Sequence, residues 1–263
     1  MLRAAWTNQS LIRALTHREI VGRYRGSAFG TAWSIINPLL MLLIYTFVFT
    51  SIFKMRWSAG AEGSSADFAL MLFAGMLVFS FFSECVTRAP ALVFGNPNLV
   101  KKIVFPLEIQ AYVTVGAGLF QTAITLAILL VAIVLTKGLP PPTALLLPLV
   151  ILPLCFINLG AIWFLSSLGV FLRDIGQVIG HLVMMTMFLS PMFYPVTAIP
   201  EQFRALFFLN PMTFLMEQTR HVLLLGQPPD WTHLALFTAG SIAFAWLGFW
   251  WFQRTRPGFA DVL

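Results

Sequence analysis

The chain has 263 residues, of which 59% are hydrophobic and 10% are charged, and 26 of them are phenylalanine. A soluble globule of this length needs more polar side chains to cover its surface, so the composition excludes one and predicts an integral membrane protein. The net charge of +6 does not indicate nucleic-acid binding, because 11 of the 16 lysines and arginines fall in segments that we expect on the cytoplasmic side of a membrane.

The first 30 residues are polar and basic, and the apolar run that follows is long enough to span a bilayer. This order favours a retained anchor over a cleaved signal peptide. Apolar residues at near-helical spacing between arginines predict a helix over residues 7–25 that lies on the membrane surface. A basic flank that only orients the chain is the alternative. Gly26, Ser27 and Gly30 then supply a flexible turn into the first span.

Charge-free or nearly charge-free runs predict six membrane spans in one domain covering residues 1–263. The expected spans are residues 31–53, 68–89, 109–136, 145–172, 175–195 and 231–253. Lysine and arginine concentrate on one side of this topology, which places both termini in the cytoplasm. The five basic residues left for the exterior are Lys54, Arg56, Lys137, Arg204 and Arg220.

Within the first span, Pro38 lacks a backbone N–H and therefore frees the carbonyl of Ser34, so we expect a kink there. Asn37 beside it needs a polar neighbour. At the end of the second span, Glu84 and Arg88 are four residues apart and can pair on one helix face. An ordinary interfacial ion pair is the simplest interpretation of that spacing.

Two further segments are too broken to be spans. Residues 90–108 mix prolines and a glycine with apolar residues and the pair Lys101 and Lys102, which predicts a short cytoplasmic helix pressed against a partner. Residues 200–226 are mostly apolar but are interrupted at Asn210 and Pro211, and neither half can cross the bilayer. We expect a re-entrant pair of helices on the exterior side, with two helices lying flat on the outer surface as the alternative.

The residues needed for several kinds of chemistry are missing. The four histidines stand on different predicted elements and show no metal-binding spacing. We expect His181, in span five, to be a hydrogen-bonded core residue. The sequence has no G-x-x-x-x-G-K-[ST] phosphate loop, and its spans lack the buried carboxylates of an ion-coupled pump. Energy for uphill transport would therefore have to come from another chain.

Three motifs, in order along the chain, resemble a known family. They are REIVGRYRGSAFGTAWSIINPLLMLLIYTFVFTSIF, FLRDIGQVIGHLV and MFLSPMFYPVTAIPEQFRALFFLNPMTFLMEQTRHVLLLG. Together they are similar to the permease subunits of type-2 ATP-binding-cassette exporters. Within that family the chain most resembles the branch that exports O-antigen, capsular polysaccharide and teichoic acid.

The resemblance implies a homodimer of six-span subunits in a bacterial inner membrane, with two copies of a separate ATPase subunit beneath it. ATP and Mg would bind that ATPase, and this chain would carry no cofactor and no metal. The cargo would be a lipid-linked polysaccharide, moved through an aromatic-lined channel at the homodimer interface, and membrane lipid would surround the dimer. The residues expected to couple the permease to the ATPase are Arg18, Arg23, Arg25, Asn96, Pro97, Lys101, Lys102, Arg173 and Asp174.

A polysaccharide is best held weakly at many places, and aromatic rings suit this because they contact sugar faces without committing to one hydroxyl pattern. We therefore predict a path between spans one and five, with hinges at Pro38 and Pro191. Packing and lipid contact are the alternative role for each ring. The predicted path residues are Trp33, Tyr45, Phe188, Phe193 and Tyr194.

Two competing functions remain open at this level. The same architecture could export a small drug, lipid or haem, in which case a small amphiphile would stimulate the ATPase. A membrane-embedded glycan-modifying enzyme, such as an acyltransferase, would instead need an essential intramembrane histidine or carboxylate, and His181 is its best candidate.

Overall fold

The computed structural model describes residues 1–23, 26, 29–52, 54, 57, 65–96 and 105–262, and this part of the chain is all helical apart from turns and short connections. Five helical stretches within it are long and apolar enough to cross a membrane. They are Gly30–Ile52, Ser65–Arg88, Ile109–Lys137, Pro142–Phe171 and Trp231–Val262. A sixth, shorter apolar helix runs over Ile175–Phe188.

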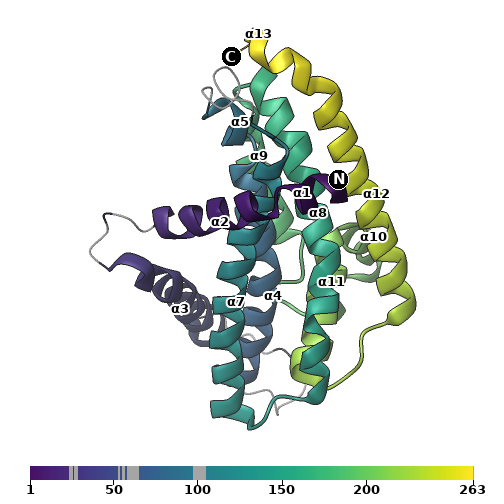
Figure 1. Ribbon diagram of the computed structural model, residues 1–263. Coiled ribbons are helices and arrows are strands. Elements are labelled where there is room, and N and C mark those ends of the chain that lie inside the picture. The colour runs from purple at the N-terminus through teal and green to yellow at the C-terminus, as the bar shows by residue number, and fades with distance from the viewer. Residues whose placement is uncertain are drawn as a thin grey trace.

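The N-terminal half begins with short helices and then enters the bundle. Its helices are α1 (Leu2–Thr7), α2 (Gln9–Arg23), α3 (Trp33–Thr46, after a 3-10 turn at Gly30–Ala32 and continued by a π-helical turn at Phe47–Ile52), α4 (Ser65–Arg88), α5 (Ala91–Phe94) and α7 (Ile109–Lys137). Figure 1 shows α4 and α7 side by side, with α2 crossing α7 and α3 standing at the edge of the bundle.

The C-terminal half contains the remaining spans and residues 200–226, which we call the broken segment. Its helices are α8 (Leu147–Phe171), α9 (Ile175–Phe188), α10 (Glu201–Leu209), α11 (Pro211–Arg220, continued by a π-helical turn at His221–Leu225), α12 (Trp231–Thr255) and α13 (Phe259–Val262), with short 3-10 turns at Pro142–Leu146, Val196–Ala198 and Arg256–Gly258. In Figure 1, α12 lies along one side of the bundle, with α10 and α11 beside its first half.

Helix α4 is the centre of the packing, because α3, α7, α8, α9 and α11 all contact it. Two glycines allow another close contact, between α8 and α12. A Cβ atom added to Gly248 would lie 2.3 Å from the carbonyl oxygen of Gly160. Within a membrane there is no hydrophobic driving force between helices, and small residues such as these glycines let two helix backbones pack closely.

One end of the bundle is closed by polar contacts between distant segments. Arg256, just after α12, donates to the carboxylate of Glu108 at 2.9 Å and to the carbonyl of Phe105 at 3.3 Å. Gly169, near the end of α8, lies against the carbonyl of Pro90. The start of α7 and the ends of α4, α8 and α12 therefore share this end of the molecule.

The expected fifth span is shorter as a helix than predicted. We expected residues 175–195, but α9 ends at Phe188 after 14 residues and the chain continues as turns. A 14-residue helix is about 21 Å long, which is less than the thickness of the hydrocarbon core. The broken segment, by contrast, forms the two short helices α10 and α11 that its sequence indicates, and α11 packs against α4 and α8.

Candidate functional site

A polar groove lies between α2, α3, α4 and α7, close to the end of the bundle where α4 terminates. Its volume is about 430 Å³. The residues that line it are Arg23, Trp33, Asn37, Pro38, Met41, Phe73, Met76, Ser80, Glu84, Arg88, Gln121 and Thr125. Asn37, which needed a polar neighbour, opens into this groove, so each of the four helices contributes to one partly polar chamber.

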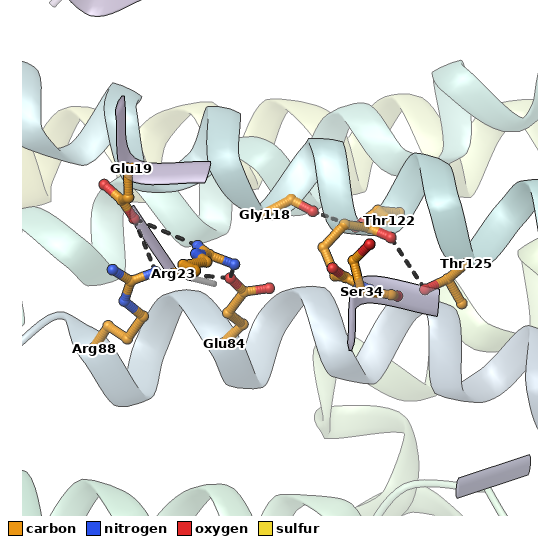
Figure 2. Close-up of polar contacts among 9 residues, drawn as sticks. Glu19, Arg23, Ser34, Glu84, Arg88, Gly118, Thr122 and Thr125 are labelled. Carbon is orange, nitrogen blue, oxygen red and sulfur yellow. Dashed lines mark hydrogen bonds and ion pairs between the residues drawn. The ribbon is translucent and has the colours of Figure 1, made fainter. Parts of the chain in front are cut away.

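Three charged residues of the groove lining, Arg23, Glu84 and Arg88, form ion pairs together with Glu19 of α2, and we refer to these four as the four-charge cluster. Arg23 of α2 pairs with Glu84 of α4, and Arg88 of α4 pairs with Glu19 of α2 at 2.8 Å. Longer contacts join Arg23 to Glu19 at 3.4 Å and Arg88 to Glu84 at 3.8 Å. Figure 2 shows the four side chains meeting between the two helices.

The cluster has two positive and two negative charges, so its formal net charge is zero. The expected pair within α4, Glu84 with Arg88, is present, but each of these residues has a closer partner on α2. All four side chains are partly shielded from solvent. Removing one of them would leave an opposite charge poorly compensated, which costs more than an exposed pair contributes. The cluster therefore holds α2 and α4 in a fixed relation.

Farther into the groove, Pro38 leaves the carbonyl of Ser34 without its helical donor, as the sequence predicts. The side-chain amide of Gln121, on α7, donates to that carbonyl at 2.7 Å. The chain remains α-helical on both sides of Pro38. A hydrogen bond between helices thus replaces one within the helix, and α3 is held to α7 at its proline.

Beside the four-charge cluster, a second cleft of about 450 Å³ opens between α2, α5 and the start of α7. Two of the predicted ATPase-coupling residues, Arg18 and Asn96, line it together with Arg88 and Phe105. Both Arg18 and Asn96 are exposed. The structure therefore brings a surface-helix residue and a residue of the 90–108 segment to one open cleft.

The other predicted coupling residues are placed differently. Arg23 belongs to the four-charge cluster, whereas Arg173 and Asp174 are exposed at the turn between α8 and α9. The remaining ones lie outside the described residues, namely Arg25, Pro97, Lys101 and Lys102. Before α3, Gly26 and Gly30 have φ angles of +88° and +51°. These values lie in the left-handed region, which glycine adopts readily.

The predicted aromatic path divides into two groups. Trp33 lines the polar groove and meets Phe29 edge-on at 5.7 Å. The other group is centred on Phe193, which contacts the rings of Tyr45 at 5.4 Å and Phe188 at 6.4 Å. Helix α3 therefore meets the turn after α9, which the sequence predicted as the end of span five, through aromatic side chains.

Within this second group, Phe193 itself is only 6% exposed, whereas Phe188 is 58% exposed. Phe193 thus packs inside one subunit, and Phe188 faces outward. Tyr194 is half-buried, and its hydroxyl donates to the carbonyl of Phe188 at 2.6 Å. Tyr194 also meets the ring of Phe207 from α10 at 6.2 Å, which connects this turn to the broken segment.

Two predicted residues lie in other surroundings than the sequence indicates. Pro191 lies beyond the end of α9 in a buried turn, since proline and the residue before it disfavour helix continuation, so the predicted hinge at Pro191 would lie in this turn and not within a helix. His181 is not a core histidine. Its ring is exposed, and Nδ1 bonds the carbonyl of Gln177 in the preceding turn at 2.8 Å.

Sequence reasoning assigned Arg220 to the exterior side of the membrane but did not predict that its side chain is buried inside the protein. That side chain is 2% exposed. It donates to the carbonyls of Met71 at 3.1 Å and Met192 at 3.2 Å and to the carboxylate of Glu217 at 2.7 Å. The ring of Trp57 lies 4.2 Å from the guanidinium carbon.

The three-residue spacing of Glu217 and Arg220 predicts that they pair on one helix face, but it does not predict burial, because Glu201 and Arg204 have the same spacing and form an exposed pair. Arg220 ties α11 to α4 and to the turn after α9. Gly75 of α4 makes room for it, because a Cβ there would lie 2.8 Å from Nη2 of Arg220. The broken segment is therefore fixed to the centre of the bundle.

Comparisons with known proteins agree with this architecture. Residues 10–224 match the ABC-2 type transporter family. The chain is 27% identical to the O-antigen export system permease protein RfbA of Myxococcus xanthus, over 100% of this chain and 99% of that protein. It is 23% identical to a protein of the same name from Klebsiella pneumoniae, over 96% and 95% of the two chains.

A third relative, the polysialic acid transport protein KpsM of Escherichia coli, is 25% identical over 86% of this chain and 87% of its own length. The family match covers the surface helix, the polar groove and the broken segment in one continuous stretch. The chain is therefore a multi-pass membrane protein and belongs to the ABC-2 type transporter family.

Proposed function

We propose that the chain is the membrane subunit of an ATP-driven exporter of lipid-linked polysaccharide in a bacterial inner membrane, either O-antigen or capsular polysaccharide. It works as a homodimer with two copies of an ATPase subunit, which bind ATP and Mg, and both termini of the chain are cytoplasmic. The observation that carries the proposal is its similarity, from end to end, to permeases named for O-antigen export.

The four-charge cluster supports a specific coupling route. The ATPase subunits contact α2 and the cleft that contains Arg18 and Asn96, and they move when they bind ATP. Since Arg23 and Glu19 tie α2 to α4, a displacement of α2 reaches the core of the bundle. The same displacement pulls on α3, because only a short connection with two left-handed glycines separates it from α2.

The helix α3 is suited to move because its outward face is exposed within the described part of the chain. Leu43 is 65% exposed and Phe47 is 58% exposed. The face of α9 that includes Met184 and Phe188 is similarly exposed. We place the second copy and the translocation path against these two faces. Tyr45, Phe188 and Trp33 then contact the sugar rings, while Phe193 supports them from inside.

The test is reconstitution of the chain with its ATPase subunit in phospholipid vesicles. We expect a lipid-linked glycan to stimulate ATP hydrolysis and to appear on the far side of the membrane. Stimulation by small amphiphiles but not by the glycan would support a drug or lipid exporter instead. Turnover of the glycan without any ATPase subunit would contradict the proposal and favour a membrane-embedded enzyme.

A further inference from the structure

A large apolar cavity of about 740 Å³ lies at the other end of the bundle from the four-charge cluster. The ion pair of Arg256 with Glu108 fixes the end of α12 beside the start of α7, so the Trp231 end of α12 points away from the cluster. The cavity lies along this first half of α12. Neither the coupling route nor the proposed translocation path uses it.

The walls of the cavity come from α10, α11 and α12, and Ile157 of α8 also lines it. One wall is a face of α12 that runs from His233 to Phe244. The opposite wall is the corner between α10 and α11, where Phe208 and Phe214 line the space. The rings of Phe214 and Phe237 meet at 5.1 Å and join the two walls. Apart from its mouth and the side chain of Ser241, the cavity is lined by apolar residues and a glycine.

The dimensions of the cavity fit one hydrocarbon chain. The α12 wall covers eleven residue steps, which correspond to about 16 Å of helix. The hydrocarbon core of a bilayer is about 30 Å thick, so the chains of one leaflet occupy about 15 Å. A chain that enters at His233 would therefore end near Phe244, close to the middle of the membrane.

The mouth of the cavity supplies the polar contacts that a headgroup needs. Asp230 caps α12 by accepting the backbone N–H of His233 at 3.1 Å, and its other oxygen contacts Nδ1 of the same histidine at 2.7 Å. The His233 side chain is 70% exposed. A polar pair thus stands at the first turn of the span, directly above an apolar chamber.

One position shows that the chamber is open. A Cβ atom added to Gly240, in the middle of the α12 wall, would meet nothing within 4 Å. Glycine is a poor helix former, and an open position in an apolar span is one where larger side chains would fit without strain. Space kept free beside Gly240 is space that another molecule can occupy.

We propose that this cavity is a binding site for an acyl chain of a bilayer phospholipid, with its headgroup beside Asp230 and His233. The lipid fills the gap between α12 and the α10–α11 corner and packs against the broken segment. It adds apolar contacts to the corner between α10 and α11, where Phe208 and Phe214 line the cavity. The site is distinct from the path of the cargo and takes a structural lipid.

The experiment fills the cavity with a large side chain introduced at Gly240. The complex of the chain with its ATPase subunit is purified from vesicles of phosphatidylethanolamine and phosphatidylglycerol, and retained lipid is measured by native mass spectrometry. We expect the wild type to retain a phospholipid and Gly240→Trp to lose it. The matched control is Gly180→Trp on α9, where an added Cβ also meets nothing within 4 Å, and it should retain the lipid.

Should Gly240→Trp not assemble, Gly240→Leu gives a smaller obstruction at the same point and should lose part of the retained phospholipid. Equal retention by the wild type and an assembled Gly240 variant would overturn the proposal. A retained mass equal to that of a polyprenyl carrier, or of a second polypeptide seated in the cavity, would overturn it as well. The retained lipid is measured without any transport, so a failure of this proposal can be distinguished from a failure of the proposed polysaccharide cargo.

Discussion

The spans Gly30–Ile52 and Ser65–Arg88 have the same mean hydropathy but very different surroundings. None of the most apolar stretch of the first is buried inside the subunit, whereas 67% of that stretch is buried in the second, which is α4. Their composition predicts that both cross the membrane, and their packing within the subunit distinguishes them. The helix α4 is the fixed core, and α3 is the span left free for a partner or for movement.

The connections of the two spans follow the same division. Arg220 and Gly75 lock α4 to the broken segment, and five helices pack around it. The helix α3 is held by the bond of Gln121 to Ser34 near its start and by the packing of Tyr45 on Phe193 near its end, and its other face is exposed. Substitutions around α4 should therefore reduce stability, whereas substitutions in α3 should change transport and leave stability almost intact.

The largest effect should come from Arg220→Met. The change removes the donor for two buried carbonyls and the partner of Glu217, and we expect a loss of about 3 kcal/mol, at the low end because Glu217 is partly exposed. Arg204→Met is the matched control. Arg204 pairs with an exposed Glu201 and donates to the carbonyls of Ile199 and Thr197. It is partly exposed, so water can replace these contacts and its loss should stay below about 1 kcal/mol. Denaturant unfolding in detergent measures both, and equal losses would contradict the role of Arg220.

A smaller effect is expected from Gly75→Ala. The new Cβ would stand 2.8 Å from Nη2 of Arg220, whose three hydrogen bonds prevent it from moving away. We expect a loss of about 1–3 kcal/mol despite the better helix propensity of alanine. Gly180→Ala, on the exposed face of α9, should gain about 0.5–1 kcal/mol from propensity alone. Thermal unfolding of the two variants should shift in opposite directions.

In α3, Pro38→Ala should alter export more than stability. Alanine restores a backbone N–H that competes with Gln121 for the carbonyl of Ser34, so the link between α3 and α7 weakens. We expect a stability change below about 1 kcal/mol together with slower glycan export in the reconstituted vesicles. Gln121→Leu should slow export similarly, and the double variant should be no slower than either, because both changes act on one bond.

The smallest effect concerns the exposed cap of α12. The backbone N–H of His233, and then its ring, lower the pKa of Asp230. A lowered carboxyl pKa contributes stability above the unfolded value of about 3.9, and this contribution is lost as the pH falls through the lowered pKa. Wild-type stability should therefore fall slightly more than that of Asp230→Asn between about pH 5 and pH 3. Parallel pH profiles of thermal unfolding would contradict this assignment.

Much of the fold could be predicted from the sequence, because long charge-free runs and breaking prolines determine where helices lie in a membrane protein. The freed carbonyl at Ser34 and the two short helices after Pro200 are of this kind, since each follows from residues close together in the sequence. The end of α9 at Phe188 was missed because an apolar run does not show where a helix stops. Pro191 lies three residues beyond this stop, where a proline is common after a helix end.

The charged contacts were harder to predict because they join distant segments. The spacing of Glu84 and Arg88 predicts a pair within one helix, and only the crossing of α2 over α7 brings Arg23 and Glu19 beside them. The burial of Arg220 depends in the same way on α4 and on the turn at Met192. Mean hydropathy also did not distinguish α3 from α4, because it does not depend on which helices pack against a span.

The most direct test of the account is a double-mutant cycle on the four-charge cluster in the complete exporter with its ATPase subunit. Arg23→Gln, Glu84→Gln and the double variant are compared for glycan exported per ATP hydrolysed. We expect each single variant to lower this ratio about tenfold, equivalent to about 1.4 kcal/mol in coupling, and the double variant to be no worse than either single one. An unchanged ratio in all three, with export at the wild-type rate, would contradict the claim that the cluster transmits movement from α2 to the spans.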